Sequence, residues 1–250
     1  TDSETTPKTV TNPESYDSYT KLMLHVEGSG NSFTDSAASK AVTTNGDVTQ
    51  TTAQYKLGGR SAVFDGSGDY LSLADSDDWN FGSGDFTIDF WVRFNTAAPS
   101  NVSFVEQATD GQNRWYCALT NNYGGNVQRL SMYFRDVTNF PASETRADYY
   151  SPVWVPNTGQ WYHLSFVRSG SSAYIFIDGV SQTLIAQTAL AGDVGNIASA
   201  LWVGGLGPNN SNMLNGNIDE LRISKGVARW TANFTPPSSP YGKVYTVTGT

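Results

Sequence analysis

The segment from Phe86 to Phe94 constrains the fold more than any other part of the chain. It reads Phe-Thr-Ile-Asp-Phe-Trp-Val-Arg-Phe, so an apolar side chain occupies every second position. Successive side chains of a β-strand point to opposite faces, which puts Phe86, Ile88 and Phe90 on one face and Asp89 on the other. The pattern therefore predicts a strand over the whole segment.

Further strands follow the same logic. Trp161–Arg168 and Ala173–Ile177 are predicted strands joined by a Ser-Gly-Ser-Ser turn, and Leu22–Val26 is another. Asp178-Gly179 predicts a hairpin turn, because a type I′ turn requires positive φ at both central residues. Weaker strands are predicted near residues 62–64, 70–73, 104–107, 116–119, 130–134, 201–203 and 217–223. Roughly a dozen short strands at close spacing predict a two-sheet sandwich.

Composition supports an all-β fold class and excludes two classes of partner. The 250 residues are 38% hydrophobic and only 15% charged, a profile of short strands joined by polar turns. The net charge is −8 and no basic stripe is present, which argues against nucleic-acid binding. No uncharged run approaches the ~20 residues of a membrane span. With Cys117 as the one cysteine, no intrachain disulfide can form.

The chain divides into three predicted parts. Residues 1–20 are polar and read as an N-terminal arm or linker, residues 21–241 as one β-sandwich domain, and residues 242–250 as a C-terminal extension. Thr231–Tyr241 contains three prolines and cannot be a central strand. We expect it to pack as an extended closing strap.

Several motifs in order carry a family resemblance. They read LMLHVEG from Leu22, FDGSGDYL from Phe64, DFTIDFWV from Asp85, WYHL from Trp161, IDG from Ile177 and GNIDELRI from Gly216. Together they resemble the laminin-G-like branch of the concanavalin-A-like lectin/glucanase superfamily, from about Leu22 to Tyr241. The resemblance implies an antiparallel, two-sheet jelly-roll sandwich. Phe90, Trp91 and Trp161 are large enough to fill the space between two sheets.

The resemblance also implies a possible calcium site. Members of this family often hold calcium between the first and last strands, here at Glu27, Asn31 and Asp219. Calcium takes six to eight oxygen ligands, and the Gly28–Asn31 loop can bend to offer carbonyl groups. The alternative is a turn in which a buried carboxylate accepts hydrogen bonds from backbone amides.

Aromatic and polar residues in two loop regions are the candidate ligand-binding residues. Aromatic rings stack on the apolar face of sugars, while amide and guanidinium groups bond the hydroxyls. The candidates are Arg114, Trp115, Asn121, Tyr123, Tyr149 and Trp154. Because Trp115 and Tyr116 are adjacent on a predicted strand, one of them is expected to point inward.

The sequence offers no catalytic residues. Glucanases of the superfamily carry Glu-x-Asp-x-x-Glu on one strand, a spacing that puts carboxylates on one face for acid/base work, and it is absent here. Asp219 and Glu220 are adjacent, so on a regular strand they point to opposite faces. No nucleophile elbow, phosphate loop or zinc motif is present. We therefore expect a protein that is not an enzyme.

Three functions follow, in order of preference. The first is a carbohydrate-binding or adhesion module whose partners are glycans. The second is a structural virion decoration or assembly protein that binds other virion or surface protein subunits. A glycoside hydrolase or lyase is third. The segment from Ser224 to Pro237 resembles versions found in phage structural proteins and bacterial surface proteins, which predicts a virion-surface or secreted, extracellular location.

Overall fold

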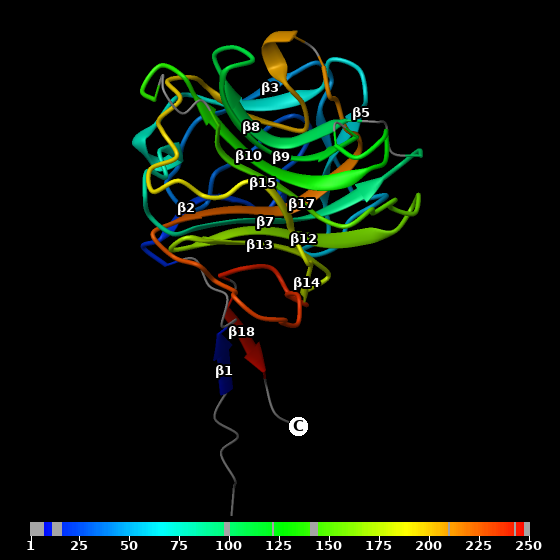
Figure 1. Cartoon of the computed structure of the whole chain (residues 1–250). Helices are drawn as coiled ribbons and strands as arrows, with labels where there is room; N and C mark the ends of the chain where they lie inside the picture. Colours follow the sequence, from blue (N-terminus) through cyan, green and yellow to red (C-terminus); the bar gives the residue numbers. More distant parts are fainter. Residues whose placement is uncertain are drawn as a thin grey trace, which may run out of the picture.

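The computed structural model confirms the predicted all-β sandwich. It describes residues 8–11, 17–97, 101–121, 123–140, 145–209, 211–242 and 244–247; for 8–11, Pro208 and 244–247 only the backbone is described. Two antiparallel sheets of eight strands each lie one above the other (Figure 1). We call them the upper and lower sheet, after their places in Figure 1, and we call their outward sides the upper face and the lower face.

The upper sheet combines strands from the middle of the chain with two early strands that are not consecutive. Its spatial order is β15 (Ile185–Thr188), β11 (Thr145–Tyr150), β10 (Arg129–Asp136), β9 (Asn113–Thr120), β8 (Val102–Ala108), β16 (Leu201–Val203), β6 (Tyr70–Leu73) and β3 (Val42–Asn45). Short 3₁₀ turns η1 (Asp77–Trp79) and η2 (Gly207–Asn209) lie in connections.

The lower sheet contains the segments with the strongest strand patterns. Its order is β14 (Val180–Ser181), β13 (Ser172–Ile177), β12 (Trp161–Ser169), β7 (Phe86–Phe94), β17 (Asn215–Lys225), β5 (Ser61–Asp65) and β4 (Thr49–Thr51), with β2 (Thr20–Leu24) also paired to β17. Asp178 and Gly179 have φ values of 50° and 75°, which confirms the predicted turn between β13 and β14.

The space between the sheets is filled by alternate side chains of both. Phe86, Ile88 and Phe90 of β7 are fully buried there, together with Phe104 of β8 and Phe134 of β10. Ring centroids of Phe90 and Phe104, from opposite sheets, are 5.3 Å apart. Dense apolar packing of this kind supplies the main stabilisation of a sandwich.

A C-terminal strap, residues 226–242, runs under the lower sheet without forming a strand (Figure 1). The Phe234 amide donates to the Gly179 carbonyl at 2.9 Å, and the Thr87 hydroxyl donates to the Val227 carbonyl at 3.1 Å. Phe234 also packs edge-on against Phe176, with centroids 5.3 Å apart. The predicted closing strap is thus confirmed, and it covers much of the lower face.

The two ends of the chain pair with each other below the strap. β1 (Lys8–Thr11) and β18 (Val244–Val247) form a two-stranded antiparallel ribbon, with Lys8 opposite Val247 (Figure 1). The rest of the predicted arm and extension, residues 1–7, 12–16, 243 and 248–250, lies outside the described residues. The division into arm, domain and extension stays a prediction. Within the described part of the chain, no helix has the length and apolarity needed to cross a membrane.

Candidate functional site

A row of large polar side chains crosses the upper face on five neighbouring strands. Each residue stands opposite the next in strand register, from β16 through β8, β9 and β10 to β11. The row consists of Trp202, Glu106, Tyr116, Tyr133 and Asp148. Apolar residues alternate with them and face the core, so the strand pattern itself puts this row on the outside.

Glu106, the second residue of the row, is a fully buried carboxylate held by two neighbours. Its Oε1 pairs with the Arg114 guanidinium, and its Oε2 accepts a hydrogen bond from the Ser103 hydroxyl. Burial raises the pKa of Glu106, although the charge of Arg114 and the bond from Ser103 act in the opposite direction. The carboxylate is thus positioned, and only partly compensated, by Arg114.

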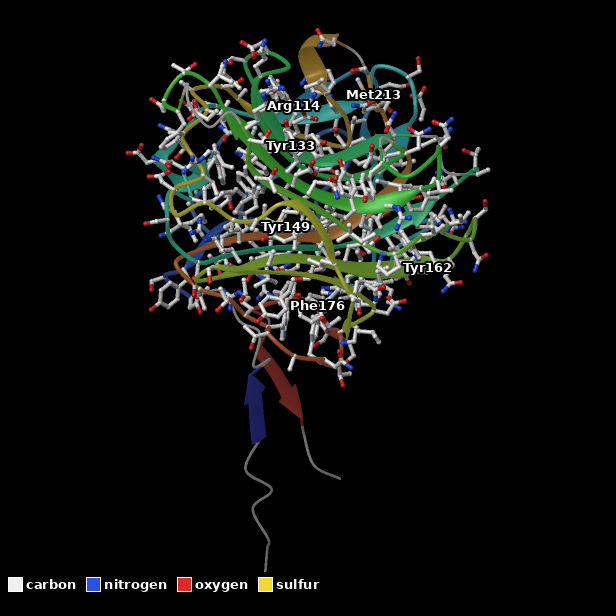
Figure 2. The ribbon with its side chains drawn as sticks, in the orientation of Figure 1. Arg114, Tyr133, Tyr149, Tyr162, Phe176 and Met213 are labelled. Atoms are coloured by element: carbon white, nitrogen blue, oxygen red, sulfur yellow. The ribbon has the colours of Figure 1, made fainter. Side chains whose placement is uncertain are left out.

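Tyrosine rings form flat stacked pairs beside Glu106. Tyr116 and Tyr133 stack with centroids 4.9 Å apart at 14°, and Tyr123 stacks on Tyr150 at 4.8 Å and 18°. The Arg114 guanidinium lies 4.8 Å from the centre of the Tyr116 ring. Figure 2 shows Arg114 and Tyr133 on the outer side of the upper sheet. Neighbouring rings fix one another, which leaves a rigid aromatic surface.

Several polar atoms of this layer have no hydrogen-bond partner among the residues that the structure describes. They are Oδ1 of Asp148, Oγ of Ser131, and Nε of Arg114 and of Arg129. Burial raises the pKa of Asp148, against the lowering effect of a hydrogen bond from Tyr150. Buried polar groups are normally satisfied, so such unpaired atoms are candidates for bonds to water or to a hydroxyl-rich ligand.

A small cavity of about 90 Å³ opens beside the row, over β8 and β9. Arg114 and Tyr116 line it together with Ser103, and the loops contribute Asn101 and Asn212. Amide and guanidinium groups around a cavity of this size can hold a few water molecules or one polar substituent of a larger ligand.

Three of the six sequence-predicted ligand residues do not reach this surface. Trp115 is 2% exposed inside the core, and its indole N–H donates to Gln107 Oε1 at 2.7 Å, so its expected role in ligand binding is wrong. Tyr149 is likewise a core residue, and Figure 2 shows it between the sheets. Trp154 packs edge-on against Phe94 and Tyr162 at the margin of the core.

The other three lie at the upper face or its rim. Arg114 and Tyr123 belong to the polar-aromatic layer, and the Asn121 amide donates to Asn101 Oδ1 at 3.3 Å beside the cavity. Sequence reasoning missed Glu106, Tyr133 and Asp148. For Tyr133 the available signal was the alternation of Leu130, Met132 and Phe134, which assigns Tyr133 to the outside.

The candidate calcium residues are brought together only in part. Asp219 Oδ2 accepts hydrogen bonds from the Lys56 and Leu57 amides, both at 2.9 Å, while its Oδ1 is buried without a partner. Burial raises the pKa of Asp219 to about 8. Glu27 adjoins the same loop, since a Cβ atom at Gly58 would overlap its carboxylate. The carboxylates of Glu27 and Asp219, with the unpaired Asp219 Oδ1, fit a cation site. Asn31 is exposed, and no described contact joins it to either carboxylate.

Asp219 and Glu220 do not obey simple strand alternation. The register of β17 shifts between Asp219 and Arg222, and Glu220 has a φ of 51°. This bulge turns Glu220 toward the strap, where its Oε2 accepts the Tyr241 amide at 2.9 Å and its Oε1 meets His25 Nδ1 at 2.9 Å. The expectation that the two carboxylates point to opposite faces is therefore wrong, because a bulge inserts an extra residue.

Another acidic cluster was not predicted. Carboxylate oxygens of Asp47, Asp65 and Asp69 lie within 4.8 Å of one another. Asp69, however, already accepts the Asp47 amide at 2.8 Å and the Asp65 amide at 2.9 Å, as in an ordinary tight turn. The cluster could hold a metal ion, but these bonds account for its geometry without one.

The lower face contains a buried ionic network beneath the strap. Asp89 accepts from Arg222 Nε at 2.9 Å and from the Tyr241 hydroxyl at 2.5 Å, and His163 Nε2 lies 3.4 Å away. Burial alone would raise the pKa of Asp89, but the charge of Arg222 and the hydrogen bonds of His163 and Arg222 hold it at about 2. On the same outer side lie Trp91 and Trp161, so their expected place in the core between the sheets is wrong.

Structural comparisons return proteins of the same fold. Domain 4 of AbnA, a GH43 extracellular arabinanase from Geobacillus stearothermophilus solved with arabinotriose, is 21% identical with a TM-score of 0.58, covering 84% of this chain and 95% of that one. The binding domain of Paraclostridial Mosquitocidal Protein 1 is 15% identical with a TM-score of 0.60, and the match covers 84% of this chain and 49% of that one. The botulinum neurotoxin DC binding domain in complex with SialylT is 12% identical with a TM-score of 0.54, and the match covers 84% of this chain and 48% of that one.

The likeness to these solved structures is limited to the fold. The chain spans about half the length of the toxin binding domains, and at these identities the shared property is the fold. A search of curated proteins gives no match. The family model described as the concanavalin A-like lectin/glucanases superfamily matches residues 65–231, which is more than half of the chain. The chain belongs to this superfamily, as the order of its motifs predicts.

Proposed function

We propose that the chain is a non-catalytic carbohydrate-binding module that binds a glycan across the upper face. The observation that carries this proposal is the row of stacked tyrosines next to polar atoms that lack partners. A sugar ring presents an apolar C–H face and a rim of hydroxyl groups. The C–H face would stack on the Tyr133 ring, and the hydroxyl groups would bond to Asp148 and Arg114.

The electrostatics of the face favour a neutral or weakly charged glycan. Arg114 is already paired with Glu106, so the central pair has little net charge. Burial also raises the pKa of the Tyr116 and Tyr150 hydroxyls, which keeps both neutral and able to donate hydrogen bonds. The arabinotriose bound to the arabinanase domain of the same fold supports this ligand class.

Binding without hydrolysis is the proposed activity because the carboxylates of the row are too far apart. Glu106 and Asp148 are separated by three strand spacings, which corresponds to roughly 14 Å. Glycosidases need their two carboxyl groups about 5–9.5 Å apart. Tyrosines that resist deprotonation are also poor general bases for a lyase.

Calcium and an extracellular location are part of the proposal. Glu27 and Asp219 would supply two carboxylate ligands, and calcium bound there would stabilise the loop at residues 56–58 rather than contact the sugar. The structural neighbour described as extracellular supports a secreted or surface location, on a bacterium or a virion. Secretion is checked by finding the protein in culture supernatant or purified virions.

The end-to-end ribbon favours a second candidate function in assembly. β1 and β18 pair only with each other among the described strands, so each has one free edge on which a neighbouring virion or surface protein subunit could add a strand. Light scattering after size-exclusion chromatography checks this: a concentration-dependent oligomer that becomes a monomer after deletion of residues 1–16 supports assembly.

The test of glycan binding is an array screen of the purified chain with calcium and again with a chelator. We expect saturable binding that Tyr133→Ala reduces at least tenfold. Tyr19→Ala is the matched control, because Tyr19 is 47% exposed and remote from the row, and it should bind like the wild type.

Three other results would contradict parts of the proposed function. A folded protein that binds no glycan under either condition overturns the proposed function. Equal binding by Tyr133→Ala and the wild type moves the site away from the upper face. Release of reducing sugar or of an unsaturated product from a bound glycan overturns the non-catalytic assignment.

A further inference from the structure

A separate groove of about 520 Å³ opens on the lower face, on the opposite side of the sandwich from the upper face. It is lined by Lys56, Leu57, Trp91, Trp161, Asp178 and Pro236–Ser238. This volume lies within the roughly 300–1,000 Å³ typical of small-molecule sites. Nothing in the function proposed for the upper face uses these residues.

Two tryptophans from adjacent strands form the floor of the groove. Trp91 pairs with His163 and Trp161 with Arg93, so the two indoles are diagonal neighbours, about 7–8 Å apart. Trp161 is half-buried, and among the described residues no aromatic ring stacks on it. Part of its side chain is therefore exposed in the groove, where a ligand could stack on it.

The walls of the groove are held in place before any ligand arrives. On one side, the Lys56 and Leu57 amides bond to Asp219 at 2.9 Å. On the other side, the strap is fixed by the Tyr241 amide, which donates to Glu220 at 2.9 Å. Because both walls are anchored to β17, binding does not have to order a loop, which favours affinity.

The polar groups of the groove include one cation, one anion, the Ser238 hydroxyl and one indole donor. Lys56 Nζ lies 4.2 Å from the centre of the Trp91 ring. Asp178 Oδ1 accepts the His163 amide at 2.8 Å, which orients this exposed carboxylate at the end of the groove. The indole N–H of Trp91 has no partner. With one positive and one negative group, the groove suits a neutral ligand with both donors and acceptors.

We propose that this groove is a second saccharide-binding site, which takes one neutral sugar ring stacked on Trp161 with its hydroxyl groups bonded to Lys56 and Asp178. The strap that seals the ionic network also forms one wall of this site. A chain with sites on both outer faces is bivalent and cross-links two glycan strands. The groove does not depend on the upper face for its ligand, so either site can fail without the other.

The test uses the full chain labelled with 5-fluorotryptophan, whose ¹⁹F resonances report the two faces separately. Trp161 and Trp91 report the groove and Trp202 the upper face, with assignments from Trp→Phe variants. The probes are cellotriose, laminaritriose and arabinotriose. We expect at least one of them to shift the Trp161 and Trp91 signals saturably, and we expect Tyr133→Ala to leave these shifts unchanged.

Two substitutions identify the polar contacts. Lys56→Gln removes a charge-assisted hydrogen bond and should weaken binding at the groove about tenfold. Lys21→Gln is its matched control, because Lys21 Nζ donates to the Ser18 carbonyl in a remote turn, and it should have no effect. Trp161→Phe keeps the stacking surface and should retain saccharide binding, whereas Trp161→Ala should abolish the shift at Trp91.

Four results overturn the second site. The first is a shift at Trp202 alone, which leaves the function of the upper face intact. The second is a Trp161 shift that disappears in Tyr133→Ala, which indicates one site with an indirect effect. The third is no shift with any of the three saccharides. The fourth is a Trp161 shift with a decaproline peptide and none with the saccharides, which assigns the groove to a peptide ligand.

Discussion

The two outer faces of this sandwich contain the same chemical pair in opposite circumstances. On the upper face Glu106 pairs with Arg114, and on the lower face Asp89 pairs with Arg222. Burial raises the pKa of Glu106, whereas the charge of Arg222 and further hydrogen bonds hold the pKa of Asp89 at about 2. The difference lies in the number of groups around each carboxylate.

The strap accounts for part of the difference between the two carboxylates. Asp89 is enclosed by Arg222, His163 and the Tyr241 hydroxyl of the strap, so its charge is compensated in the absence of water. Glu106 has fewer partners, since among the described residues only Arg114 and Ser103 bond to its carboxylate. The lower network therefore stabilises the fold, while the upper one keeps bonding capacity for a ligand.

The largest predicted effect is the loss of Arg222. Arg222→Met leaves a fully buried, charged Asp89 without its main partner and should lower the free energy of unfolding by about 3–5 kcal/mol. Arg93 on neighbouring β7 is only half-buried, so Arg93→Met should lower the free energy of unfolding far less. Urea denaturation measures both. Equal losses for the two variants would mean that Arg222 stabilises the fold no more than a half-buried arginine on the same face.

A smaller loss is expected where the strap crosses the hairpin turn. A Cβ atom at Gly179 would overlap the Phe234 carbonyl oxygen, so Gly179→Ala should destabilise the chain by about 1–3 kcal/mol through overpacking, in addition to the cost of its positive φ. Gly170→Ala is the matched control, because Gly170 has a φ of 58° and open space around it. If both variants unfold at the same urea concentration, the strap is not held at Gly179.

The pH dependence of stability tests the uncompensated carboxylate beside the groove. The pKa of Asp219 is about 8 in the folded chain, above its ordinary value, so the folded state binds the extra proton and loses stability as the pH rises toward 8. Between pH 6 and 8 the loss should be about 1–2 kcal/mol. Asp219→Asn should flatten this slope.

Calcium should act against the same loss at pH 8, raising the melting temperature of the wild type but not of Asp219→Asn. Calorimetry in calcium and in chelator measures both effects. A slope that Asp219→Asn leaves unchanged would assign the pH dependence to other groups. A calcium effect that persists in this variant would move the metal elsewhere.

The smallest effect on stability is expected from the substitution that mirrors Arg222→Met. Arg114→Met should cost only about 1 kcal/mol, because Glu106, whose pKa is already raised, can take up a proton and stay bonded to Ser103. The same variant should lose glycan binding on the upper face. A destabilisation as large as that of Arg222→Met would mean that the two pairs have the same structural role.

The sequence predicts the fold better than the site, for a physical reason. Strict alternation gave β7 its correct bounds, Phe86–Phe94, and β6 and β16 were also predicted to the residue. β11 (Thr145–Tyr150) and β15 (Ile185–Thr188) were missed, because polar side chains on strands near the sheet edge hide the period of two.

The site depends on information that one strand does not contain. Glu106 and Asp148 are 42 positions apart in the chain and meet in one row only through the registers of β8 to β11. The bulge at Glu220 likewise follows from how β17 pairs with β2, β5 and β7. Pairing between strands, rather than the pattern within one, decides which side chains share a surface.

The ribbon of β1 and β18 also has a mechanical consequence. Lys8 and Val247 stand at its far end, so tension applied to both ends of the chain opens its hydrogen bonds one after another, from that end toward the sandwich. Hydrogen bonds that open one at a time need little force. The chain on both sides of the sandwich therefore lengthens before the pulling force reaches β2 and β17. Because the ribbon leaves the molecule below the strap (Figure 1), a molecule held by either end points its row of tyrosines away from the attachment.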